Sequence, residues 1–212
     1  MVYPDYRRLG IFKTLFDFVL EEWKKRKDKR LLLLCDRNSL PGQAFIQSLQ
    51  SINYDHSEYE MFLRRSPRKY VTQKGITLRK ATNADAGEIA HQNTLYFGGK
   101  EEENILLPEE KASEGLFIYM AELDKAIVGK VHLEISSDGI GGIYGLGVLP
   151  EYRRKGYGRE ILSLAIEKLR EEYKAKDIML QVDVKNDKAL DLYRSCGFEV
   201  TSVMDYYEFK SV

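Results

Sequence analysis

The chain has 212 residues, of which 43% are hydrophobic and 31% are charged, a composition typical of a folded globular protein. Its 33 basic residues balance its 33 acidic ones, which excludes an overall charge that would favour nucleic acid or an anionic membrane. No apolar run approaches the roughly 18–20 residues of a membrane-spanning helix and no signal peptide precedes the first predicted helix, so we expect a soluble cytoplasmic protein.

The first segment of the chain, residues 1–64, predicts an extended lead, a turn and an amphipathic helix. The lead and turn read MVYPDYRRLG, and the helix that follows carries an apolar stripe at helical spacing. A buried strand, LLLLCD, comes next, and then a short helix and the aromatic-rich extended stretch NYDHSEYEMFL. A strand would normally precede such a turn, and here only Met1 does.

The basic, weakly patterned residues 65–74 predict a linker, and residues 75–212 predict a complete α+β domain. A strand at 75–81 leads to a helix that we expect Asn83 to cap. After a polar loop come a hairpin that turns at Asp124–Lys125 and a further strand, GIGGIYGLGV.

An internal repeat relates the two segments. Residues 2–26 reappear at 148–172 with a shift of 146 residues, which matches the proline, the Arg-Arg pair and the glycine of the two turns. The apolar helical stripe is maintained, and a buried strand, a short helix and an aromatic-rich segment follow in the same order. We therefore predict that residues 1–64 are a rear half-copy of the complete domain.

The turn of the second copy has the composition of a phosphate-binding loop. Glycines bring backbone amides close to an anion, and a helix N-terminus adds unpaired N–H donors. A basic loop whose glycines serve only its geometry is an equally good interpretation of these residues alone. A Walker loop is excluded because Arg159-Glu160 follows the last glycine, and a dinucleotide fingerprint is excluded because Pro150 stands where it needs a glycine.

Together with the segment NDKALDLYRSCGF, this loop makes residues 75–212 resemble the GNAT family of N-acetyltransferases from end to end. The resemblance implies a mixed sheet flanked by helices and acetyl-CoA as the donor. Its pyrophosphate would bind the amides of residues 154–159, and its pantetheine would pair with the preceding strand where that strand splays from its neighbour. The implied cofactor-binding residues are Leu146, Gly147, Val148, Arg153, Arg154, Lys155, Gly156, Tyr157, Gly158, Arg159 and Asn186.

Tyr193 is the candidate catalytic residue. The resemblance places it near the sulfur atom, where a tyrosine hydroxyl with a pKa of about 10 can protonate the leaving thiolate. A tyrosine packed in the core is the alternative. The backbone N–H near Val148 is the candidate donor to the developing oxyanion. The general base stays unassigned among Tyr144, Glu134 and His132 acting through water, and we expect each of these to be an ordinary strand residue.

The acceptor is expected to be a primary amine on a small molecule or a peptide. Members of the family line the acceptor site with the region equivalent to loop 98–115, and an acidic loop would favour a cationic amine. The glutamates concerned are Glu101, Glu102, Glu103, Glu109, Glu110 and Glu114. We favour the simpler interpretation, a solvated helix end. We expect Cys196 to be a small buried residue. The number and spacing of the cysteines and histidines predict no metal site.

The first copy has lost groups that acetyl transfer needs, so we expect it to be non-catalytic. Phe12 replaces the second loop glycine, and Ile46 stands at the position of Tyr193. Its apolar helix and strand must still be buried, which predicts a homodimer or tight docking on the complete domain. The opening in mid-motif suggests a tandem protein whose first front half is missing, by natural truncation or a trimmed start.

Three functions were compared on these residues. An acetyl-CoA-dependent N-acetyltransferase is favoured because both Asn186 and Tyr193 are present. A non-catalytic acetyl-CoA sensor or interaction module is the alternative, because the strand before the loop carries no carboxylate. A nucleic-acid-binding protein that uses the two Arg-Arg turns is disfavoured by the balanced charge and by the lack of an aromatic stacking platform.

Overall fold

The computed structural model describes residues 2–26, 30–63 and 74–210, so the predicted linker, except Lys74, lies outside the described residues. Within these ranges, no helix is long and apolar enough to cross a membrane. In the same part of the chain, no group of three or more His, Cys, Asp or Glu side chains could hold a metal ion.

The chain divides into two compact units. Unit 1 holds Met1–Glu58 together with Val203–Val212, and unit 2 holds Tyr59–Ser202. Two long strands, β2 (Ile52–Leu63) and β8 (Glu199–Phe209), have residues in both units. No single position in the sequence therefore separates the two units, because unit 1 combines residues 1–58 with residues 203–212.

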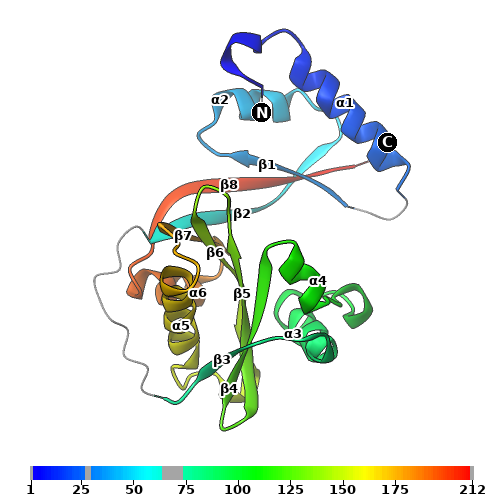
Figure 1. Cartoon of the computed structure of the whole chain (residues 1–212). Helices are drawn as coiled ribbons and strands as arrows, with labels where there is room; N and C mark the ends of the chain where they lie inside the picture. The colour runs from blue at the N-terminus through cyan, green and yellow to red at the C-terminus, as the bar shows by residue number, and fades with distance from the viewer. Residues whose placement is uncertain (1, 27–29, 64–73, 211–212) are drawn as a thin grey trace. The chain divides into compact units, whose positions relative to one another are not determined.

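Unit 2 is a mixed sheet with helices on both faces (Figure 1). Its strands hydrogen-bond in the order β2-β7-β6-β5-β4-β3. Neighbours from β3 to β6 are antiparallel, whereas β6 and β7 are parallel. Besides β2 and the start of β8, the elements of unit 2 are β3 (Thr77–Lys80), η2 (Asn83–Asp85), α3 (Ala86–Phe97), η3 (Glu101–Glu103), α4 (Pro108–Ser113), β4 (Leu116–Leu123), β5 (Ala126–Ile135), β6 (Ile140–Val148), η4 (Pro150–Tyr152), α5 (Tyr157–Glu171), β7 (Asp177–Asp183) and α6 (Asp187–Ser195).

The first helical segment of unit 2 begins differently from the prediction. Thr82, not Asn83, is the cap: its side chain and that of Asp85 form a reciprocal capping box around a short 3₁₀ turn. The side chain of Asn83 instead accepts a hydrogen bond from the amide of Glu109 at 3.1 Å. The predicted Asn83 cap is therefore wrong. The predicted hairpin turn is confirmed, with positive φ angles of 50° at Asp124 and 70° at Lys125.

The core of unit 2 lies between the sheet and α5. The predicted apolar stripe of this helix, from Ile161 to Leu169, is buried to within 2% exposure and contacts side chains of β5 and β6. Burial of the four Ile and Leu side chains of this stripe is worth about 1.5–3 kcal/mol each, which fixes the start of α5 relative to the end of β6.

Unit 1 is smaller and buries fewer apolar side chains. Its elements are η1 (Pro4–Tyr6), α1 (Ile11–Lys24), β1 (Leu31–Asp36), α2 (Leu40–Gln47) and the unit 1 parts of β2 and β8, with strand order β1-β8-β2. β1 and β8 are antiparallel, with Leu31 opposite Phe209. The rings of Phe16 and Phe45 (5.1 Å apart) and of Phe16 and Phe209 (6.0 Å apart) form the aromatic centre of the core.

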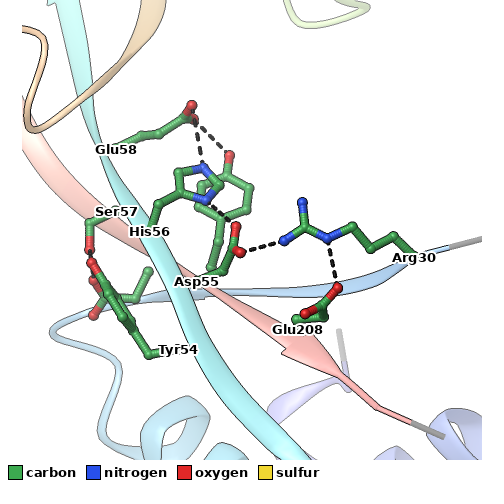
Figure 2. Close-up of polar contacts among 9 residues, drawn as sticks. Arg30, Tyr54, Asp55, His56, Ser57, Glu58 and Glu208 are labelled. Atoms are coloured by element: carbon green, nitrogen blue, oxygen red, sulfur yellow. Dashed lines mark hydrogen bonds and ion pairs between the residues drawn. The ribbon is translucent and has the colours of Figure 1, made fainter. Parts of the chain in front are cut away.

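Charged side chains of unit 1 pair with one another (Figure 2). Arg30 forms an ion pair with Asp55 and a second one with Glu208, whose carboxylate accepts at 2.8 Å. His56 lies between Asp55 at 2.6 Å and Glu58 at 3.7 Å. Because each group already has a protein partner, this cluster stabilises the strands and is not a candidate site.

Candidate functional site

The loop between β6 and α5 is the first part of the predicted site. After η4, Arg154 has a φ of 64° and Gly156 a φ of 82°. Glycine adopts such left-handed angles freely, whereas they cost an arginine about 1–2 kcal/mol. The turn lets α5 begin directly at Tyr157, with Gly156 as its N-cap and no side chain capping the first turn.

The amide groups of this loop are available to a ligand. The N–H of Glu160 bonds to the carbonyl of Gly156, but the N–H groups of residues 154–159 have no acceptor among the residues that the structure describes. Unpaired amides at the start of a 15-residue helix produce a positive potential. They fit the pyrophosphate of acetyl-CoA.

The basic side chains of the loop have different surroundings. Arg153 Nε donates to the carbonyl of Val148 at 2.9 Å, and Arg159 donates to Ser195 Oγ at 2.8 Å. These two arginines therefore fasten the loop to β6 and α5 to α6. Arg154 is exposed, and the structure gives it no such contact among the described residues. It is the arginine best placed to meet a phosphate.

Lys155 and Tyr157 complete the predicted loop residues. Lys155 Nζ lies 5.4 Å from the centre of the Tyr152 ring, and its carbonyl accepts a hydrogen bond from Lys74 Nζ at 2.6 Å. Tyr157 is half-buried, as is Gly158. Lysine and tyrosine side chains thus surround the loop, and Lys74 lies against its backbone at Lys155 and Gly156.

The second part of the predicted site is the end of β6. Pairing of β6 with β7 stops at Ile143 opposite Leu180, although both strands continue beyond that point. On the other side, the register with β5 shifts, so that Gly145 and Leu146 together face Val131 in a β-bulge. The stretch from Tyr144 to Val148 therefore has no partner on β7 within the described strands, as the predicted pantetheine edge requires.

Tyr193 and Asn186 lie on α6 and at its start. Asn186 is the N-cap, and its side chain accepts from the amide of Ala189 at 3.2 Å. An open depression at the end of β7 is lined by residues 183 and 185–188 and includes Asn186. Tyr193 is 9% exposed, and burial raises its pKa to about 12. A phenol that stays protonated at neutral pH can donate, but not accept, a proton.

A polar group that the sequence prediction missed lies under the β-bulge. Lys130 and His132 of β5 are buried, and Lys130 Nζ lies 3.2 Å from His132 Nε2. Burial lowers the pKa of Lys130 to about 7, and burial together with Lys130 lowers the pKa of His132 to about 3. The available signal was Lys130 itself, a charged residue in the middle of a mostly apolar strand.

The structure does not select a general base from the three candidates. His132 is buried, and its low pKa makes it a poor base at neutral pH. Tyr144 is half-buried beside Glu134, and burial together with this carboxylate raises the tyrosine pKa. The predicted buried position of Cys196 is confirmed, and burial raises the pKa of its thiol.

Some of the glutamates in loop 98–115 already have polar partners. Glu101 contacts His91 at 2.8 Å, Glu114 contacts Lys111 at 2.6 Å, and Glu109 accepts from the amide of Asn83 at 3.3 Å. The first contact joins η3 to α3, the second lies at the end of α4, and the third joins α4 to η2. They agree with the interpretation of a solvated helix end.

Comparison with known proteins places the site in a family. Residues 86–198 match the acetyltransferase (GNAT) family model. The chain is 27% identical over 145 residues to the N-alpha-acetyltransferase of Sulfurisphaera tokodaii, a match that covers 63% of this chain and 86% of that protein. It is 35% identical over 154 residues to the mycothiol acetyltransferase of Streptomyces griseus, a match that covers 66% of this chain and 48% of that protein.

A solved structure gives the same result for the fold. The GCN5-related N-acetyltransferase from Kribbella flavida aligns with a TM-score of 0.67 at 16% identity, over 93% of this chain and 74% of that one. At that identity the likeness concerns the fold alone. The family model covers more than half of the chain, and the named relatives are acetyltransferases. The protein is therefore an acyltransferase, and the chain belongs to the GNAT family of acetyltransferases.

Proposed function

We propose that unit 2 transfers the acetyl group of acetyl-CoA to a primary amine by direct attack in a ternary complex. The observation that carries this proposal is the run of unpaired amides at residues 154–159 next to the unpaired end of β6. Together they offer a diphosphate site and a strand edge for an extended arm. The donor supplies an activated thioester, and the protein positions it against the amine.

The chain's own residues would perform three tasks. The unpaired backbone at the end of β6 would hold the pantetheine and stabilise negative charge on the carbonyl oxygen. The hydroxyl of Tyr193 would protonate the departing sulfur. The amine would lose its proton before attack, to solvent or to a base that stays unassigned.

The acceptor class is the least restricted part of the proposal. The two named relatives are an N-alpha-acetyltransferase and a mycothiol acetyltransferase. A first screen should therefore compare short peptides with a free α-amino group with amino sugars and polyamines. Acceptor-dependent release of CoA is the readout, and an unreactive acetylated peptide is the control.

The phosphate loop gives the first test. We expect one acetyl-CoA per chain in a calorimetric titration, and loss of binding by at least about tenfold in Arg154→Glu and Gly156→Asp. Both changes place a carboxylate at the anion site, and the second also puts a side chain at a φ of 82°.

The matched controls are Arg8→Glu and Gly10→Asp, which make the same changes in the unit 1 loop. Unchanged binding in these controls would locate the site in unit 2. Two molecules per chain would mean that both loops bind, and wild-type protein that binds no acetyl-CoA would overturn the proposal.

Tyr193 gives the second test. Tyr193→Phe should lower kcat about 10²-fold and leave the KM for acetyl-CoA within about twofold, because only proton transfer is removed. The hydroxyl has no hydrogen-bond partner among the described residues, so thermal stability should hardly change. Unchanged kcat would show that another group protonates the thiolate. A protein that binds acetyl-CoA but turns over no amine would support the sensor alternative.

Backbone geometry supports the proposal that residues 1–64 are a half-copy of the complete domain. Arg8 and Gly10 have φ angles of 63° and 77°, against 64° and 82° at Arg154 and Gly156. Arg7 Nε also donates to the carbonyl of Val2 at 3.2 Å, as Arg153 does to Val148. A shared composition would not by itself reproduce these angles and this contact.

The same comparison supports self-association through α1. Leu15 and Val19 are 52% and 48% exposed, whereas the equivalent Ile161 and Ala165 of α5 are fully covered by the sheet of unit 2. β1 is the terminal strand of its sheet order, whereas the equivalent β7 pairs with β6. We propose that a second copy of the chain covers this apolar face.

Substitution on α1 tests this interface. Leu15→Glu and Val19→Glu should shift a dimer to monomer in analytical ultracentrifugation, because a carboxylate buried without a partner costs several kcal/mol. Lys13→Glu, on an exposed position of the same helix, is the control that should leave the dimer intact. A wild-type chain that sediments as a monomer at all concentrations would refute the self-association.

A further inference from the structure

Lys130 is a fully buried lysine without a carboxylate partner among the described residues. Its relative exposure is 0%, and its polar contacts among the described residues are with a histidine and a backbone carbonyl. Buried lysines are rare and normally paired, because removing the ammonium from water is costly. A methionine would fill similar space without this cost. The position of Lys130 therefore calls for a reason other than packing.

The contacts of Lys130 converge on the β-bulge. Nζ donates to the carbonyl of Gly145 at 3.1 Å and lies 3.2 Å from His132 Nε2. Two aromatic rings of α3 complete its surroundings, with ring centres 5.5 Å away at Tyr96 and 5.7 Å away at Phe97. Among these contacts within the described residues, the group that belongs to the bulge is the carbonyl of Gly145, which accepts a hydrogen bond from the lysine.

Neighbouring side chains restrict the bulge further. A Cβ on Gly147 would lie 2.0 Å from the Tyr96 ring, so this ring packs directly on the backbone of β6. Gly145 has a φ of 55°, and a Cβ there would lie 3.1 Å from the ring of His132. Arg153, the other cation beside Tyr96, has its guanidinium 5.9 Å from that ring. Lys130 thus sits at the centre of a layer that supports residues 145–147 from one side.

We infer that Lys130 is a positioning residue: by holding the carbonyl of Gly145 it fixes the bulge that turns the end of β6 away from β7 and presents its backbone to the pantetheine arm. This inference rests on the proposed function for its ligand. The bulge itself is independent of that function. Without the donor, residues 145–147 could return toward regular pairing and the edge would lose its fixed geometry.

Two variants separate the hydrogen bond from the volume of the side chain. Lys130→Met keeps the volume and removes the donor, whereas Lys130→Gln keeps an N–H donor without a charge. Ile166→Ala, in the buried stripe of α5, is the control for a general loss of stability.

The ligands are acetyl-CoA and 3′-phosphoadenosine 5′-diphosphate, which is the same nucleotide without the pantetheine arm. We expect Lys130→Met to lower the affinity for acetyl-CoA about tenfold and the affinity for the nucleotide less than about twofold. Lys130→Gln should recover most of the acetyl-CoA affinity. Ile166→Ala should leave the ratio of the two affinities unchanged, although it lowers the melting temperature.

An NMR readout makes the test independent of ligand binding. In the ¹⁵N spectrum, Lys130→Met should shift the amide signals of Leu146 and Gly147, and Lys130→Gln should restore them. If the wild type binds neither ligand but these signals shift, the proposed function fails and the positioning of the bulge stands. The inference is wrong if the amide signals stay in place in Lys130→Met. It is also wrong if this variant loses affinity for both ligands by the same factor.

Discussion

Gly129→Ala should destabilise unit 2 by about 3 kcal/mol or more, whereas Gly87→Ala should leave it equally stable or stabilise it by up to about 1 kcal/mol. A Cβ on Gly129 would lie 2.2 Å from the carbonyl oxygen of Gly147 and 3.2 Å from the Cα of Val148. Both are backbone atoms of β6, so no rotation of a side chain can relieve the clash. The strand pair itself would have to separate.

Gly87 provides the matched comparison. It lies in α3, and a Cβ there would meet no atom within 4 Å. Urea denaturation followed by circular dichroism compares the two variants directly. Equal stabilities would mean that β5 and β6 can shift apart at low cost. The bulge could then not depend on a fixed approach of the two strands.

The stability of the wild type should rise with pH between about 7 and 10.5, relative to Lys130→Met. The folded chain has its Lys130 pKa lowered to about 7, against an ordinary value of 10.5. Between these values the unfolded chain binds a proton that the folded chain does not, so raising the pH disfavours unfolding. The expected slope approaches about 1.4 kcal/mol per pH unit.

Comparison with Lys130→Met cancels the titration of the other groups. The variant should be more stable than the wild type at pH 7, because no lysine has to lose its proton or be buried with it. The difference between the two proteins should shrink as the pH rises toward 10. Parallel stability curves would show that Lys130 keeps its ordinary pKa. That result would also mean that burial of Lys130 carries no desolvation cost, and this cost is the reason for assigning the residue a role beyond packing.

Much of the fold could be predicted because its signals are local. The apolar stripe of α5 has helical spacing, and the turn at Asp124–Lys125 separates two apolar runs. The start of the α3 region was placed one residue too late, at Asn83, because Thr82 and Asn83 are both good caps. Only the reciprocal contact between Thr82 and Asp85 distinguishes them, and that contact requires the folded geometry.

The site could be predicted where it depends on a motif and not where it depends on packing between strands. The loop at residues 153–159 has a composition that indicates its turn. The role of Lys130 depends instead on the carbonyl of Gly145, fifteen residues away on another strand. No pattern in the sequence brings these two together, because the bulge that turns the carbonyl toward the lysine is a property of the paired strands. The division of β2 and β8 between the two units has no sequence signal for a similar reason, because it depends on which strands pair in the folded sheet.

The pairing of β1 with β8 has a consequence for synthesis on the ribosome. β1 and β8 lie side by side (Figure 1). Leu31 of β1 lies opposite Phe209, and the Phe209 ring also packs on Phe16 and Trp23. α1 and β1 must therefore wait, with apolar side chains uncovered, until β8 has also left the exit tunnel. All of Tyr59–Ser202 is translated in that interval. A nascent chain stalled before β8 should consequently recruit holding chaperones to its N-terminal segment, long after unit 2 has begun to fold.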